Sequence, residues 1–157
     1  MLFRSFLRLL ICIMLPLIVG GVSGIATADA IPGWYQTLNK PFFNPPNWLF
    51  GPVWTTLYML MGISLYQIVS LPKSEMRNKA IQIFCLQLIL NFSWSFLFFY
   101  FHNPAISLIE IIALWVCILW MIRVFKNLKP AAAYLNVPYL FWVSFASILN
   151  GGYVWLN

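Results

Sequence analysis

Charged side chains are scarce in this sequence, and acidic ones most of all. Among 157 residues there are 9 Lys and Arg but only 3 Asp and Glu, so 8% of the chain is charged while 62% is hydrophobic. Soluble domains carry about 25% charged residues, and a globule of this length could not bury so much apolar surface away from water. The surrounding solvent must therefore be largely lipid. This excludes a cytosolic enzyme, a disordered tail, a small secreted disulfide scaffold and a second soluble domain.

Histidine and cysteine are too few for most catalytic or metal chemistry. His102 is the one histidine and cannot supply paired axial ligands, so we expect no permanently bound cofactor and no Ser-His-Asp triad. Cys12, Cys85 and Cys117 lie inside apolar runs without a CxxC spacing, which predicts buried thiols and no metal site. The net charge of +6 comes from short basic clusters between apolar runs, a pattern that does not favour nucleic acid binding.

Long apolar runs make up most of the chain. A bilayer core needs about 20 mainly apolar residues per spanning helix, and these runs do not alternate as the strands of a membrane β-barrel do. Pro and charged residues separate the runs. The sequence therefore predicts an all-α membrane protein, a single domain over residues 1–157 that forms a five-transmembrane-helix bundle. The expected helices cover roughly residues 6–28, 49–70, 80–101, 105–125 and 134–156, with a long loop over 29–48.

The basic residues predict which way the bundle faces. Short loops rich in Lys and Arg stay in the cytoplasm, and Lys40 alone falls on the side of the predicted membrane opposite the N-terminus. We therefore expect a cytoplasmic N-terminus and an external C-terminus in a multi-pass protein of the bacterial inner membrane. The eight cations on the N-terminal side are Arg4, Arg8, Lys73, Arg77, Lys79, Arg123, Lys126 and Lys129.

A cleavable signal peptide is an alternative interpretation of the N-terminus. Arg4 and Arg8 precede an apolar stretch that ends near Ala28-Asp29-Ala30. However, the stretch is longer than the usual core of about 7–15 residues. Its small residues between Gly20 and Gly24 would let helices approach closely. We expect the stretch to be retained as the first helix.

Three ordered motifs carry a family resemblance. Residues 34–58 read WYQTLNKPFFNPPNWLFGPVWTTLY, residues 87–94 read QLILNFSW, and residues 138–150 read PYLFWVSFASILN. Together with an acidic residue in the fourth predicted helix, these stretches resemble the TspO/MBR family, also called tryptophan-rich sensory proteins, translocator proteins or peripheral-type benzodiazepine receptors. The resemblance runs over nearly the whole chain.

The resemblance implies a five-helix bundle, expected as a homodimer, whose pocket opens toward the first loop. It implies binding of porphyrins and haem-related tetrapyrroles, with cholesterol and synthetic ligands in animal members. Some bacterial members are reported to degrade protoporphyrin IX in light, and Trp54 and Trp142 match the indoles implicated there, so they would be catalytic only in that chemistry. The family's pocket residues match Trp48, Trp54, Asn91, Trp94, Trp142 and Ala146.

Departures from the family pattern limit these implications. No cation follows Tyr153, so the cholesterol-associated pattern is incomplete and sterol binding gains no support. The first loop has Phe43 where relatives often carry Trp. The small-residue dimer motif of the third helix is replaced by Gln82 and Leu86, which leaves the dimer face open.

Amide and aromatic side chains share one stripe of the third predicted helix. Gln87, Asn91, Trp94 and Phe98 are spaced by three and four residues. Amides at bilayer depth are costly unless they are hydrogen-bonded. They could bond neighbouring helices or meet the polar edge of a ligand, and the resemblance favours the ligand.

Aromatic residues mark the second and fifth predicted helices. Tyr58 shares a face with Trp54, and Trp142 shares one with Asn150. Trp142 lies eight residues inside its predicted helix, about 12 Å deep, below the usual interfacial belt. Flat rings at that depth suit a planar aromatic ligand. Tyr35 belongs to an apolar, proline-rich first loop that could rest on the membrane interface or form a lid over a pocket.

Glu110 is the one acidic residue within a predicted span, where a buried carboxylate is expensive. The family usually has Asp at this position. Glu110 could pair structurally with a neighbour or take part in ligand or ion binding, and both interpretations stay open.

Three functions follow from these features. The first is an integral membrane tetrapyrrole-binding protein that acts as a receptor, sensor or transporter with a porphyrin (protoporphyrin IX or haem) as its ligand. The second is a light-dependent enzyme that degrades protoporphyrin IX. The third is a transporter of an unrelated small solute, which rests on the helices and Glu110 alone.

Overall fold

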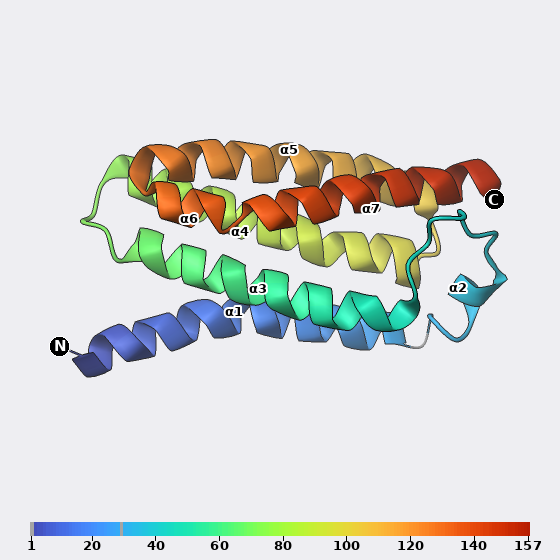
Figure 1. Ribbon diagram of the computed structural model, residues 1–157, viewed down its shortest axis with the longest axis horizontal. Helices are drawn as coiled ribbons and strands as arrows, with labels where there is room; N and C mark the ends of the chain where they lie inside the picture. The colour runs from blue at the N-terminus through green and yellow to red at the C-terminus, as the bar shows by residue number, and fades with distance from the viewer. Residues whose placement is uncertain (1, 29) are drawn as a thin grey trace.

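A computed structural model describes residues 2–28 and 30–157, which form a bundle of long helices packed side by side (Figure 1). Within these residues five helical segments are long and apolar enough to cross a membrane, which confirms the predicted fold class. The elements are α1 (Leu2–Ala28), α2 (Trp34–Thr37), α3 (Asn47–Val69), α4 (Glu75–Ser95), the π-helix η1 (Phe96–Tyr100), α5 (Pro104–Leu128), α6 (Pro130–Tyr134) and α7 (Val137–Leu156).

The helix ends differ from the predicted ones for local reasons. The helix expected from residue 80 begins at Glu75, because Ser74 caps it by accepting a hydrogen bond from the Arg77 backbone N–H. The helix expected from residue 134 begins at Val137 as α7, and a turn at Leu135 and Asn136 separates it from α6, which lies in the predicted connection. Pro138 lies in the first turn of α7, where a missing backbone N–H costs nothing.

Glycines bring α1 and α3 into close contact. A Cβ added at Gly62 of α3 would collide with the backbone of Cys12 and Ile13 in α1. A Cβ added at Gly20 of α1 would collide with the ring of Tyr58 in α3. Small residues allow this kind of close approach between helices in lipid. The packing therefore depends on two glycines, one on each helix.

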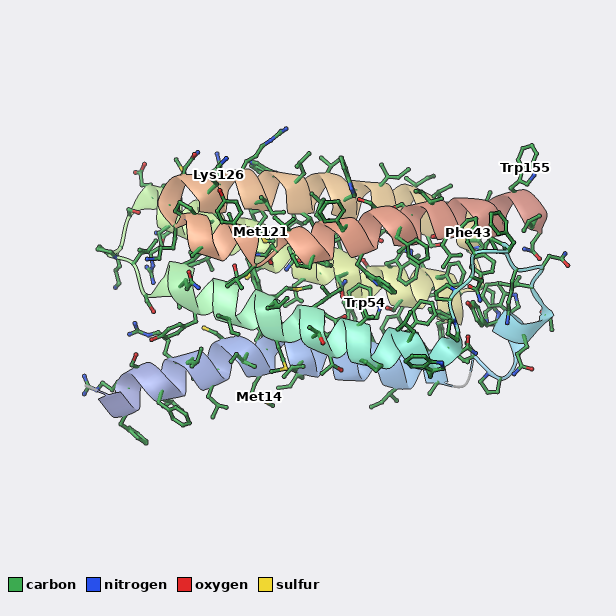
Figure 2. All side chains as sticks on the ribbon, in the orientation of Figure 1. Met14, Phe43, Trp54, Met121, Lys126 and Trp155 are labelled. Carbon is green, nitrogen blue, oxygen red and sulfur yellow. The ribbon has the colours of Figure 1, made fainter. Side chains whose placement is uncertain are left out.

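The two ends of the bundle differ in what they hold. The N-terminus, the α3–α4 connection and the turn into α6 share one end, and Lys126 is labelled near it (Figures 1 and 2). The first loop, α2 and the C-terminus share the other end (Figure 1). Asp29, part of the alternative cleavage motif and of the predicted first loop, lies outside the described residues.

Gly62→Ala should destabilise the bundle by about 1–3 kcal/mol, because the added methyl meets the α1 backbone, which cannot rotate away. The measurement is thermal unfolding of the purified variant in detergent. Gly51→Ala, in the same helix, is the matched control because its Cβ would point into open space. Equal unfolding temperatures for the two variants would contradict the close contact.

Candidate functional site

A cavity of about 470 Å³ opens between α1, α3, α7 and the end of α4, beneath the first loop. Aromatic rings form most of its deep wall, and small residues of α1 between Gly20 and Thr27 form one side. Ligand pockets commonly have this size and this mainly apolar lining. Seven of the eleven predicted ligand-binding residues line it, namely Tyr35, Trp54, Tyr58, Trp94, Trp142, Ala146 and Asn150.

Indole and phenol rings are held in fixed orientations around the cavity. Trp54 lies in the interior between α3 and α7 (Figure 2), and its ring stacks on Tyr58 with the centroids 5.3 Å apart. Trp142 contacts Phe50 edge to face at 6.0 Å. The Trp142 Nε1 atom is buried and has no hydrogen-bond partner among the described residues. The cavity wall therefore includes preset flat ring surfaces.

Asn150 and Trp94 use their polar groups within the protein. Asn150 Oδ1 accepts hydrogen bonds from Trp94 Nε1 and from Ser107 Oγ, both at 3.1 Å. Asn150 Nδ2 donates to the carbonyl of Pro104 at 2.8 Å. This network joins α4, α5 and α7. Both residues thus face the cavity mainly with their apolar atoms.

The two amides of α4 lie outside the cavity wall. Asn91 is buried, accepts a hydrogen bond from the Tyr58 hydroxyl at 2.7 Å and donates one to the Tyr139 hydroxyl at 3.1 Å. It therefore bonds neighbouring helices, the first of the two roles open to it. Gln87 is fully buried, and both polar atoms of its amide lack a hydrogen-bond partner among the described residues.

Two further predicted residues lie away from the cavity. Trp48 is 72% exposed because it faces outward at the start of α3, whereas Asn47 beside it lines the cavity. Glu110 is half-buried between α4 and α5, where its Oε1 accepts a hydrogen bond from Ser93 Oγ at 3.0 Å. Glu110 is therefore paired with a neighbouring helix and is absent from the cavity wall.

The first loop closes over the cavity and is tied to α7. Asn44 Oδ1 lies 3.0 Å from the Tyr35 hydroxyl and 2.7 Å from the Tyr153 hydroxyl, and the two hydroxyls are 2.7 Å apart. Asn39 and Asn157 form a second tie, in which each side chain bonds the backbone of the other residue or of its neighbour. The loop is thus a lid, as one of the two interpretations of it predicted.

Several residues of the cavity and its lid could not be found from the sequence. Phe98 belongs to the predicted stripe of the third helix, but Phe99 beside it lines the cavity only because each hydrogen bond of η1 spans one more residue than in an α-helix, which turns two successive rings toward the cavity. Asn44 shows its role only when the loop meets Tyr153. For the α1 side, the glycine-rich run at residues 20–24 was the available signal, but it indicated helix packing rather than a cavity wall.

Comparison with known proteins places this architecture in a family. A model of the TspO/MBR family matches residues 12–156. The chain belongs to the TspO/MBR family. It is 40% identical to the tryptophan-rich protein TspO of Chlorobaculum tepidum, over 98% of both chains, and 41% identical to the protein of the same name from Archaeoglobus fulgidus, over 98% of this chain and 99% of that one.

A third relative carries a name that refers to a role. The chain is 35% identical to the tryptophan-rich sensory protein of Cereibacter sphaeroides, over 74% of this chain and 72% of that protein. Membership of the TspO/MBR family and five apolar helices make this a multi-pass membrane protein.

Asn91→Leu should destabilise the protein by about 1–2 kcal/mol, because it leaves two buried tyrosine hydroxyls without their shared partner. Gln87→Leu is the matched change one helical turn away, and it should leave stability unchanged or raise it, since its amide has no hydrogen bond to lose. Thermal unfolding in detergent compares the two. A larger loss in Gln87→Leu would contradict the assignment of the structural role to Asn91.

Proposed function

We propose that this TspO/MBR family protein binds a tetrapyrrole of the porphyrin or haem type in the cavity beneath the first loop, as a receptor, sensor or transporter. The observation that carries the proposal is the wall of preset aromatic rings, including Trp54 and Trp142. A planar aromatic ligand gains about 0.5–1.5 kcal/mol per offset-stacked ring beyond the burial of its area.

Two details of the cavity support a ligand with polar groups at its edge. Asn47, at the start of α3, lines the cavity and carries an amide that can both donate and accept a hydrogen bond. Ala146 lies one turn further along α7 and leaves space where a larger side chain would fill the cavity. The tetrapyrrole would bind reversibly, since its contacts would be noncovalent ring stacking and hydrogen bonding.

In this proposal His102 holds the lid in place and does not bind the ligand. Its imidazole is exposed and stacks on the indole of Trp34 with the centroids 4.5 Å apart. It thereby joins the first loop to the turn after η1. A ligand that needs no axial imidazole, such as a free porphyrin, fits this arrangement.

The proposal includes a sensory role and an orientation in the membrane. The name of the Cereibacter sphaeroides relative supports a sensor. The positively charged end, with eight of the nine basic residues, would face the cytoplasm of a bacterial inner membrane and the lid would face outward. We also propose a homodimer, with its interface unassigned.

Ala146→Leu should weaken porphyrin binding at least tenfold, because the added carbons occupy space that the ring needs. The measurement is a titration with protoporphyrin IX in lipid nanodiscs, followed by quenching of tryptophan fluorescence in the dark. Ala113→Leu adds the same atoms on the exposed face of α5 and should bind as the unmodified protein does. Unchanged binding in Ala146→Leu would exclude this cavity as the site.

Light-dependent degradation of protoporphyrin IX is the second candidate function. Trp54 and Trp142 line the same cavity, so both indoles would contact the ligand and could stabilise or quench radical intermediates. Trp142→Phe should weaken binding modestly and abolish any spectral change on illumination, while Trp155→Phe should do neither, since Trp155 is 88% exposed and points away from the bundle (Figure 2). Absorption spectra in the dark and under light test this. Equal effects of both variants would indicate general damage instead of a site.

A further inference from the structure

A second concave feature lies on the opposite half of the bundle. It is a groove of about 550 Å³ between α4 and α5, and one face of α4 together with Trp120 of α5 forms its walls. Neither the lid nor the tetrapyrrole proposal involves it. From the end of the bundle inward, its α4 residues are Glu75, Asn78, Lys79, Gln82, Ile83 and Leu86.

The polarity of the groove changes along its length. Eleven residues separate Glu75 from Leu86, a rise of about 16 Å along the helix. The polar residues lie at the end of the bundle, where the headgroups of a bilayer would begin, and Ile83 and Leu86 lie further from that end, where acyl chains would lie. A membrane lipid has the same order of polar head and apolar chain. The groove therefore matches an amphiphile that stands upright beside the protein.

The charges within the groove have a fixed order. Glu75 begins α4 and is the outermost, whereas Lys79 lies one turn deeper, about 6 Å further along the helix. The Lys79 ammonium lies over the ring of Trp120, 5.6 Å from its centroid, so the cation is drawn across the groove. The groove thus presents a carboxylate outside and an ammonium inside.

We propose that this groove binds one phospholipid with an ethanolamine head group. In that lipid the phosphate is joined to the glycerol and lies deeper, and the ammonium is at the free end and lies further out. The phosphate would meet Lys79 with Asn78, the lipid ammonium would meet Glu75, and Gln82 would donate to an ester carbonyl. An acyl chain would lie along Ile83, Leu86 and Trp120.

The same geometry predicts discrimination between head groups. A choline head carries no N–H to donate to the Glu75 carboxylate, and a glycerol head carries no cation at all. The basic end of the bundle attracts anionic lipids in general, but that attraction does not depend on the order of Glu75 and Lys79. Exchanging the two residues therefore separates a specific site from a basic surface.

The test is native mass spectrometry of the full chain released from micelles that contain equal amounts of phosphatidylethanolamine, phosphatidylcholine and phosphatidylglycerol. We expect one retained phosphatidylethanolamine. The double exchange Glu75→Lys with Lys79→Glu keeps composition and net charge, and should lower the ethanolamine preference about tenfold, the factor for one charge-assisted hydrogen bond. Lys126→Gln removes an exposed cation outside the groove and should keep the preference.

A second pair of variants tests the apolar half of the groove, where the acyl chain would lie. Leu86→Trp fills the groove and should lower retention of the lipid, while Ile89→Trp, on the same helix but outside the groove, should not. Equal retention of all three lipids, or an ethanolamine preference that survives the double exchange, would overturn the proposal. So would a double exchange that dissociates a dimer and leaves lipid retention unchanged, since the groove would then be a contact between two copies.

Discussion

Hydrogen bonds made by four asparagine side chains, three of them buried, hold the elements of this bundle together. Asn91 joins α3, α4 and α7, and Asn150 joins α4, α5 and α7. Asn136 donates to Ser64 and to the carbonyl of Ala132, which fixes the break between α6 and α7 against α3. Asn44 ties the lid to α7. In lipid, an unpaired backbone or side-chain polar group is costly, so these few bonds restrict how the helices can pack.

The use of polar side chains to join helices also determines what lines the cavity. Asparagine and tyrosine groups that would otherwise face a ligand are used to join helices, as in the bonds of Asn150 to Trp94 and Ser107. What remains on the wall is mainly apolar ring surface, with the amide of Asn47 beside it. Such a wall selects ligands by flatness and size more than by hydrogen-bond pattern. Selection of this kind is what the proposed, reversible binding of a tetrapyrrole requires.

The sequence was sufficient to predict the spanning helices and many of the residues that line the cavity. Run length and proline positions predicted five spans, and the resemblance named Trp54, Trp142 and Ala146, which line one cavity. The resemblance also predicted Trp48 in the cavity wall, but Trp48 faces outward and Asn47 beside it lines the cavity. The residue at which α3 begins decides which of the two side chains faces the cavity. The widened turn of η1 depends on tertiary contacts, so periodicity could not find it.

The cavity and the groove lie toward opposite ends of the bundle and differ in how a ligand would reach them. The lid is tied to the end of α7 by Tyr35 and Asn44, which meet Tyr153, and by Asn39, which meets Leu156 and Asn157. No described residue covers the groove beside Lys79, which would be open to the bilayer along its length. A ligand that enters the cavity past the lid would have to break these hydrogen bonds, whereas the proposed lipid in the groove would exchange with its surroundings directly. Occupancy of the groove would stabilise the α4–α5 pair, and Trp94 of α4 and Ser107 of α5 both donate to Asn150 of α7 at the cavity wall.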